Sequence, residues 1–395
     1  MAQFIHHDLG LLNPRFDSPL LDVLTDLEHL RRLELKSTTP ETVFRQLKMA
    51  FHLLESLASA RIEGNHTTLA DYVEARVAPV ATFSERLQEI RNIEAAMQQI
   101  EETLSPGDPL SEHLLRNLHA TTVQGLERDG DRTPGSYRAG AVRIAAANHL
   151  PPNPALVPPY MKDLVEFINR GDPPKYDLMK VALAHHRFAW VHPFSNGNGR
   201  VVRLLTYAML IKYGFQVTDG VQIATAGRLL NPAAVFCADR NRYYAMLSRA
   251  DSGQESDLEA WCVYVLSGIR DELNKLNRLA DYSHLQQRVL FPAVAYARER
   301  ELVTQQEEAV LKVTIREGTV KAGDLEAALP GLNANQRTYQ IRKLQENRML
   351  QPIRPGARQY TIDFMGSTLL RGVIKALEDE GFIPPALSAP QPGTE

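Results

Sequence analysis

The sequence predicts a mainly α-helical protein with one small β hairpin inside the helical core and a C-terminal module of three short helices and a second hairpin. Apolar residues recur at helical spacing over most of the 395 residues, as at Phe44, Leu47 and Phe51. A Pro-Gly turn accompanies short β-prone runs at residues 131–144 and again at 349–362, which predicts the two hairpins.

Composition sets the class of protein. The length allows two or three domains, and 44% hydrophobic and 23% charged residues are ordinary for a globular chain. The formal net charge of −3 gives no overall attraction for nucleic acid, so any basic surface must be local. The sequence has no apolar run of 18 residues and no signal peptide, which predicts a soluble cytoplasmic protein without membrane contact.

Residues 1–110 are predicted to form an N-terminal helical region. Helices are expected at 20–35, from the Thr39-Pro40 start to about residue 63, and over 66–104. The second helix ends with Ser59 and Glu63, which lie four residues apart and therefore on one face, before a stop at Gly64. From spacing alone, this is an ordinary exposed Ser/Glu pair.

Residues 111–277 are predicted to form the central core. Helices are expected at 111–125, 160–169, 181–190, 199–214 and 258–276, and the first hairpin lies between the first two. The loop between the third and fourth helices reads His-Pro-Phe-Ser-Asn-Gly-Asn-Gly-Arg-Val-Val-Arg over residues 192–203.

The residues of this loop are typical of a site that binds an anion. A helix N-terminus offers free backbone N–H groups and a positive dipole end, and Gly197 and Gly199 let an anion approach the backbone. Arg200 and Arg203 lie on one helix face and can add bidentate charge. With His192 as a general base, the residues predict a phosphate site joined to acid–base chemistry.

Residues 192–203 resemble the signature of the Fic (filamentation induced by cAMP) family, His-Pro-Phe-x-[Asp/Glu]-Gly-Asn-Gly-Arg-x-x-Arg. The resemblance implies a Fic helical core that transfers AMP from ATP to a hydroxyl side chain of a target protein. It implies that His192 is the base, that the backbone of Gly197, Asn198 and Gly199 holds the anion, and that Arg200 clamps the β-phosphate.

Two further roles follow from the same resemblance. Arg203 is expected to bind either the γ-phosphate or the side chain of Glu63. Asn196 stands where the family usually has the acidic residue that holds Mg²⁺, and its neutral carbonyl predicts weaker Mg²⁺ binding.

Ser59 and Glu63 resemble the inhibitory motif of the family, [Ser/Thr]-x-x-x-Glu-[Gly/Asn]. In the subclass that carries this motif before the core, the glutamate pairs with the second signature arginine, here Arg203, and blocks the seat of the γ-phosphate. The resemblance therefore implies autoinhibition by Glu63.

Two more segments resemble parts of the family. Arg138 and Val142 lie in a stretch similar to the flap, which docks the target segment by strand addition. Residues 239–244 are similar to a segment near the adenine, which makes Tyr243 and Tyr244 candidates for the adenine pocket.

Residues 278–302 are predicted to be a charged helical linker, and the module at 303–366 resembles a winged helix. Duplex DNA is an expected partner because the third helix and the wing carry a basic, amide-rich face made of Gln336, Arg337, Gln340, Arg342, Lys343, Arg348, Arg354 and Arg358. Winged helices also dock proteins or form dimers, so a homodimer is the other expectation. Residues 367–395 are predicted to be a C-terminal helix and a disordered tail.

Two functions compete at this point. The first is an autoinhibited protein adenylyltransferase that uses ATP and Mg²⁺. The alternative is a winged-helix DNA-binding regulator whose Fic domain is weakly active or senses nucleotide, and it rests on the missing carboxylate at Asn196.

Overall fold

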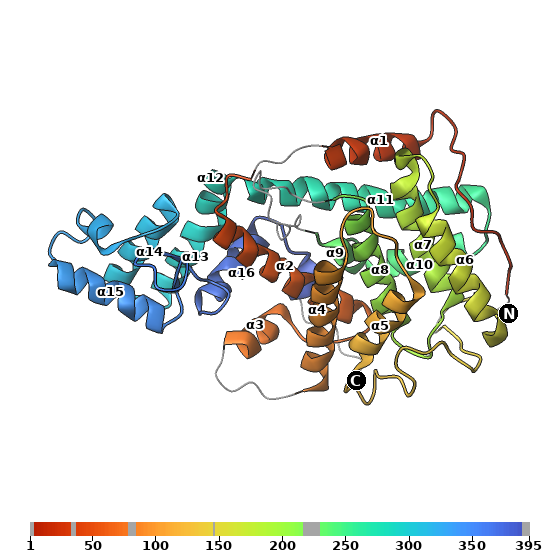
Figure 1. Ribbon diagram of the computed structural model, residues 1–395, viewed down its shortest axis with the longest axis horizontal. Helices are drawn as coiled ribbons and strands as arrows, with labels where there is room; N and C mark the ends of the chain where they lie inside the picture. The colour runs from red at the N-terminus through yellow and green to blue at the C-terminus, as the bar shows by residue number, and fades with distance from the viewer. Residues whose placement is uncertain (1–3, 33–36, 78–83, 145–146, 216–229, 389–395) are drawn as a thin grey trace.

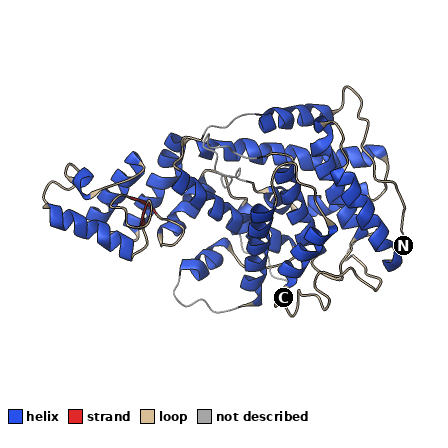
Figure 2. Ribbon diagram, viewed as in Figure 1, coloured by secondary structure: helices blue, strands red, loops and turns tan. Residues whose placement is uncertain are grey.

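The computed structural model describes residues 4–32, 37–77, 84–144, 147–215 and 230–388. Helices make up nearly all of its regular structure, and the described residues form one sheet, of two strands (Figure 2). The prediction of a mainly α-helical protein is confirmed. A body of helices fills most of the molecule, and a smaller group that includes α14 and α15 projects at one end (Figure 1). None of the helices described is long and apolar enough to cross a membrane.

The N-terminal part of the chain forms four helices: α1 (Pro19–Arg32), α2 (Glu41–Ile62), α3 (Leu69–Val77) and α4 (Glu85–Thr103). The region expected to be helical over 66–104 contains the helices α3 and α4. Ser84 starts α4 by accepting a hydrogen bond from the Leu87 amide. The long helix α2 is mostly buried because it packs against both α4 and α9 (Pro232–Ala238).

The centre of the body is a helix–loop–helix made by α7 (Asp177–Val191) and α8 (Asn198–Lys212), as the sequence predicts. Both helices are largely buried, and α8 packs against α7, α4 and α5 (Glu112–Val123). The 3-10 turns η1 (Pro154–Leu156) and η2 (Pro174–Tyr176) lead into α6 (Val157–Asn169) and α7. The helices α10 (Arg240–Ala250) and α11 (Glu255–Asn277) complete the body.

Residues 131–144 contain no strand, so the prediction of a hairpin in the core is wrong. A lone strand has no neighbour whose backbone can pair its N–H and C=O groups. The segment is fixed instead to the end of α7 by Arg138, whose guanidinium donates to the carbonyl oxygens of His192 at 2.8 Å and Pro152 at 2.6 Å. Arg138 is only 3% exposed, so its side chain positions the loop. Docking of a target segment by backbone pairing at this stretch stays a prediction. Val142, the other expected docking residue, is half-buried.

The segment predicted as a linker is helical, and many of its apolar side chains are buried against neighbouring helices. It consists of η3 (Arg278–Ala280), α12 (Tyr282–Leu285), η4 (Gln286–Leu290) and α13 (Phe291–Glu299). The predicted C-terminal helix is α16 (Leu369–Asp379), which packs on α13, and α17 (Pro385–Ser388) follows it. The end of the predicted disordered tail, residues 389–395, lies outside the described residues.

Three helical segments and a hairpin lie between α13 and α16, in the predicted order, and are called the C-terminal module below. They are α14 (Gln305–Glu317), η5 (Ala322–Leu325), α15 (Ala334–Glu346), β1 (Leu350–Pro352) and β2 (Tyr360–Ile362). The strands are antiparallel, with Leu350 opposite Ile362.

The basic residues of α15 are already paired with carboxylates of the chain. The pairs are Arg337 with Glu326 at 3.8 Å, Arg342 with Glu346 at 3.0 Å, and Lys343 with Glu307 at 2.9 Å. Such pairs compete with phosphate contacts, which need free cations. DNA binding through this helix therefore stays a prediction.

The helix α2 connects the C-terminal module with the centre of the body (Figure 1). Near its start, the Gln46 side chain donates to Ile362 O at 2.8 Å and accepts from Phe364 N at 2.7 Å. Gln46 is 5% exposed, so these bonds are shielded from water. Near its other end, α2 carries Ser59, and Glu63 follows directly after it.

Candidate active site

The loop of residues 192–199 begins where α7 ends. His192 has φ 50° and ψ 61°, a left-handed conformation that few residues other than glycine adopt. Pro193 disfavours helical geometry at the position before it, so the chain leaves α7 here. Asn198 closes the loop, because its Oδ1 accepts from Phe194 N at 2.9 Å and its Nδ2 donates to Phe194 O at 2.8 Å. The result is a fixed turn that brings the backbone to the start of α8.

The start of α8 is occupied by a carboxylate of the chain itself. A Cβ atom at Gly199 would lie 2.0 Å from Glu63 Oε1, so this carboxylate approaches the glycine backbone directly. Gly197 has φ 74°, and a Cβ atom there would come within 3.0 Å of Val123 Cγ1. The N-terminus of a helix favours negative charge. The seat predicted for a phosphate therefore holds Glu63.

Arg203 reaches the same carboxylate from within α8. Its Nη2 donates to Glu63 Oε1 at 2.8 Å and to Ser59 O at 3.0 Å, and its Nε donates to Ser59 Oγ at 2.8 Å. Its Nη1 is buried and has no hydrogen-bond partner among the residues described. Burial raises the pKa of Glu63, but the charge of Arg203 outweighs burial and holds this pKa below its usual value. The pairing implied by the inhibitory motif is present in the structure.

Arg200 is engaged elsewhere. Its Nη1 lies 3.3 Å from Glu89 Oε1 on α4, and its Nη2 donates to Asp129 O at 2.6 Å. Arg200 is 2% exposed, so here it fastens α8 to α4, and the predicted clamp on a β-phosphate is not a free side chain. Glu89 also accepts from Asn65 Nδ2 at 2.8 Å, which ties α4 to the turn after Glu63. Sequence reasoning missed Glu89, because one glutamate in a polar helix has no distinctive spacing.

A buried histidine and aspartate support the 192–199 loop. The ring of His119 stacks on Phe194, with centroids 3.8 Å apart. Its Nδ1 accepts from Gly135 N at 2.9 Å, which leaves the proton on Nε2, 3.2 Å from Asn196 O and 3.5 Å from Asp131 Oδ2. Burial lowers the pKa of His119 to about 4, so the ring is a neutral donor at neutral pH. Sequence reasoning missed this support, since these residues are far apart in the chain.

The Asn196 side chain is used inside the loop. Its Nδ2 donates to Gly130 O at 3.2 Å, and its Oδ1 accepts from Gly197 N at 2.7 Å. Within the described residues, no group of three or more His, Cys, Asp or Glu side chains is arranged to hold a metal ion. Mg²⁺ prefers carboxylate oxygens in a well-defined shell. The residues present do not fit a protein-held Mg²⁺, and the geometry favours Asn196 as a turn residue over the predicted metal ligand.

Replacing Asn196 with aspartate is therefore expected to destabilise the loop without creating a metal site. The change removes the donor to Gly130 O and sets a carboxylate against that carbonyl, which costs about 1–2 kcal/mol of unfolding free energy. Thermal unfolding with and without Mg²⁺ measures both effects. Ser195→Asp is the control, because it adds the same charge at an exposed position of the loop. Stabilisation of the Asn196→Asp variant by Mg²⁺ would contradict this assignment.

His192 is expected to act as a neutral ring throughout the physiological range. Burial, with a further effect from Arg138, lowers its pKa from 6.5 to about 4. Between these values the unfolded chain binds more protons than the native chain, so His192 costs stability only as the pH falls below about 6.5. Titration of His192 should consequently leave kcat/KM unchanged between about pH 6 and pH 8. A half-loss of activity near pH 6.5, assigned to His192, would contradict its burial.

The two adenine-pocket candidates differ in exposure. Tyr243 is 2% exposed, its hydroxyl lies 2.9 Å from His185 Nε2, and its ring packs against Phe236, so it presents no open face to a base. Tyr244 is 40% exposed and donates to Ile62 O at 3.2 Å, next to Glu63. Only Tyr244 has a surface that a nucleotide can reach in this structure.

The family model for the Fic/DOC family matches residues 109–210 of the chain. Residues 109–210 form a Fic/DOC family domain. The domain contains α5, α6 and α7, the 192–199 loop and nearly all of α8.

Relatives and solved structures extend the match beyond the Fic domain. The Protein adenylyltransferase Fic of Nematostella vectensis is 26% identical over 219 residues, which are 53% of this chain and 45% of the relative. That of Aedes aegypti is 27% identical over 266 residues, which are 62% of this chain and 48% of the relative. The chain thus spans about half the length of these relatives.

Two solved structures share the fold. A Fic family protein from Desulfovibrio desulfuricans G20 has a TM-score of 0.54 at 20% identity, over 90% of this chain and 98% of that chain. A Fic domain containing signaling protein from Bacteroides thetaiotaomicron VPI-5482 has a TM-score of 0.50 at 20% identity, over 67% of this chain and 97% of that chain. At these identities the likeness shows the Fic fold alone.

Proposed function

We propose that this chain is a protein adenylyltransferase, which transfers AMP from ATP to a hydroxyl side chain of a target protein and is held inactive by Glu63. The observation that carries the proposal is the Glu63 carboxylate, seated at the start of α8 and 2.8 Å from Arg203. A seat that takes an internal anion can take a phosphate oxygen with the same backbone and guanidinium groups. The likeness to curated adenylyltransferases supports AMP as the transferred group.

In this mechanism His192 removes the proton of the target hydroxyl, and the hydroxyl oxygen attacks the α-phosphorus of ATP. A new P–O bond forms as the bond from the α-phosphorus to the bridging oxygen breaks, and pyrophosphate leaves with the released negative charge. The backbone of residues 197–199 neutralises charge on the phosphate oxygens. Arg138 holds the His192 carbonyl at 2.8 Å and so fixes where the base stands. The chain supplies positioning and electrostatic stabilisation, which are the main needs of phosphoryl-type transfer.

Autoinhibition follows from competition for one guanidinium. A γ-phosphate and the Glu63 carboxylate are both negative, so they repel each other when both lie near Arg203. The Glu63 side chain is 34% exposed, whereas that of Arg203 is 1% exposed and is held by Ser59. Glu63 is therefore the partner that can move out to water, and Arg203 stays in place to bind the phosphate. Glu63→Gly removes the competitor and keeps the seat.

Labelled ATP tests the proposed function. The chain and its Glu63→Gly variant are incubated with ATP labelled at the α-phosphate and, separately, at the γ-phosphate, alone and with a cell lysate. The expected result is protein-bound label from the α-phosphate only, stronger for the variant. Label from the γ-phosphate would indicate a kinase. No label from either position would favour the alternative of a nucleotide-sensing, DNA-binding regulator, whose test is binding of duplex DNA by the full chain as salt is raised.

A further inference from the structure

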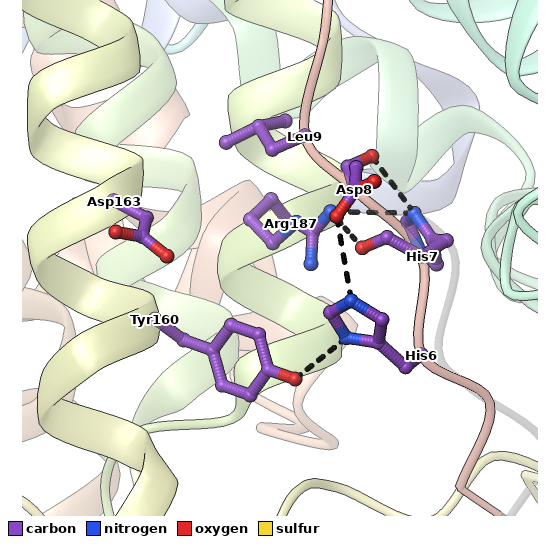
Figure 3. A pocket seen from close by; sticks show the side chains of 7 residues that line it. All are labelled: His6, His7, Asp8, Leu9, Tyr160, Asp163 and Arg187. Carbon is purple, nitrogen blue, oxygen red and sulfur yellow. Dashed lines mark hydrogen bonds and ion pairs between the residues drawn. The ribbon is translucent and has the colours of Figure 1, made fainter.

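A polar cavity lies between the N-terminal segment and the helices α6 and α7 (Figure 3). Its volume is about 320 Å³, at the small end of ligand pockets. Its polar lining comes from His6 and Asp8 of the N-terminal segment, Tyr160 and Asp163 of α6, and Arg187 of α7. None of these residues belongs to the seat at α8 or takes part in the mechanism above.

Arg187 is a buried charge without a carboxylate partner among the residues that the structure describes. It is 2% exposed, its guanidinium lies 4.6 Å from the Trp190 ring centroid, and its Nη2 donates to His7 O at 2.7 Å. Its Nε is buried without a hydrogen-bond partner in the described chain. Burial lowers its pKa to about 10, although Tyr160 and Asp8 act in the opposite direction. A buried cation of this kind is costly unless an anion compensates it.

Two carboxylates stand at the solvent side of the same cavity. The side chain of Asp8 is fully exposed, and Asp163 is exposed on α6. His6 connects the two walls, with Nδ1 2.7 Å from Tyr160 Oη and Nε2 3.4 Å from Asp8 Oδ1 (Figure 3). A purely anionic ligand such as phosphate would be repelled by these carboxylates, and a purely cationic one would be repelled by Arg187.

We propose that this cavity binds a small zwitterion of the α-amino acid class, with its carboxylate on Arg187 and its ammonium group towards Asp163 and Asp8. The buried cation and the exposed carboxylates fix the orientation of the ligand, because each charged end meets its opposite. A guanidinium favours a carboxylate through paired N–H donors. The volume of about 320 Å³ is sufficient for one free amino acid. The proposal is independent of the proposed AMP transfer.

Thermal shift of the full chain with each common L-amino acid at millimolar concentration gives the first test, followed by calorimetry with the amino acid that gives the largest shift. Its amide, which lacks the carboxylate, and its N-acetyl derivative, which lacks the ammonium, are each expected to bind at least about tenfold more weakly, as expected for the loss of one charge-assisted contact. Inorganic phosphate is not expected to displace the bound amino acid. The proposal is overturned by the absence of a shift with every amino acid, or by an amide or N-acetyl derivative that binds as tightly as the amino acid itself.

Variants locate the binding. Arg187→Gln removes the buried charge, and Asp163→Asn removes an exposed one that makes no ion pair within the described residues. Both should weaken binding at least about tenfold. Glu166→Gln is the matched control on the same helix, since its side chain is exposed and pairs with Lys162 at 3.7 Å. Asp163→Asn keeps the test decisive in case Arg187→Gln does not fold, and unchanged affinity in Asp163→Asn together with Asp8→Asn would overturn the proposal.

Discussion

Replacement of His192 by alanine, made in the Glu63→Gly background, is expected to lower AMP transfer by about 10²–10⁴-fold, the usual effect of losing a general base. ATP binding is expected to remain, because the seat consists of the backbone at 197–199 and of Arg203, and neither needs the imidazole. The rate of single-turnover transfer of AMP from ATP labelled at the α-phosphate measures the first effect. Calorimetric titration with ATP measures the second.

The control for this variant is His113→Ala. His113 lies on α5, is exposed, and its Nε2 contacts only the neighbouring Asn117 side chain among the described residues, at 3.0 Å. Its removal should leave transfer unchanged. Wild-type transfer in the His192→Ala variant would exclude His192 as the base, and a parallel loss of ATP binding would mean that His192 shapes the seat.

Glu63→Gly is expected to raise self-modification at least about tenfold, which corresponds to roughly 1.4 kcal/mol of lost competition. The variant frees Nη2 of Arg203 from Glu63 Oε1 while both contacts to Ser59 keep the guanidinium in place. The affinity for ATP should rise with the rate, because the same carboxylate opposes the γ-phosphate. The rate at which label from the α-phosphate of ATP accumulates on the chain measures self-modification, and the Kd for ATP measures the change in affinity.

Glu102→Gly is the matched control, since Glu102 is an exposed glutamate near the end of α4 whose side chain accepts from Gln98 Nε2 at 2.6 Å. It carries the same chemical change at a helix end and should not alter labelling. Glu63→Gln should be intermediate, because an amide oxygen still accepts from Arg203 but lacks the charge. Equal labelling of wild type and Glu63→Gly would mean that Glu63 only ends α2.

The sequence predicted those parts of the site whose conformation depends on residues adjacent in the chain. The loop between α7 and α8 follows from Pro193 and the glycines, which act on adjacent backbone. The proximity of Ser59 and Glu63 follows from a spacing of one helical turn, and the family resemblance supplied Arg203 as their partner.

The remaining differences all involve partners that are distant in the chain. Arg200 forms an ion pair with Glu89, more than one hundred residues earlier, and the position of Arg200 in the sequence does not reveal that pair. Residues 131–144 have the sequence pattern of a hairpin but form no strand. The segment is fixed instead by the hydrogen bond from Arg138 to the carbonyl of His192. The Asn196 side-chain amide likewise donates to Gly130 O, a partner that is distant in the chain. Tertiary hydrogen bonds outweighed local propensity in each case.

The helix α2 links two distant contacts: that of Gln46 with the C-terminal module and that of Glu63 with Arg203. It spans 22 residues, about 33 Å at 1.5 Å per residue, with Gln46 bonded to the residues around β2 near one end and Glu63 at the other. A movement of α2 that shifts both Glu63 and Ser59 relative to Arg203 also changes the free energy with which Gln46 holds Ile362 and Phe364. Linkage requires this coupling to be reciprocal: if ATP weakens the docking of α2 on the C-terminal module, a ligand of the module that weakens the same docking tightens ATP by the same factor.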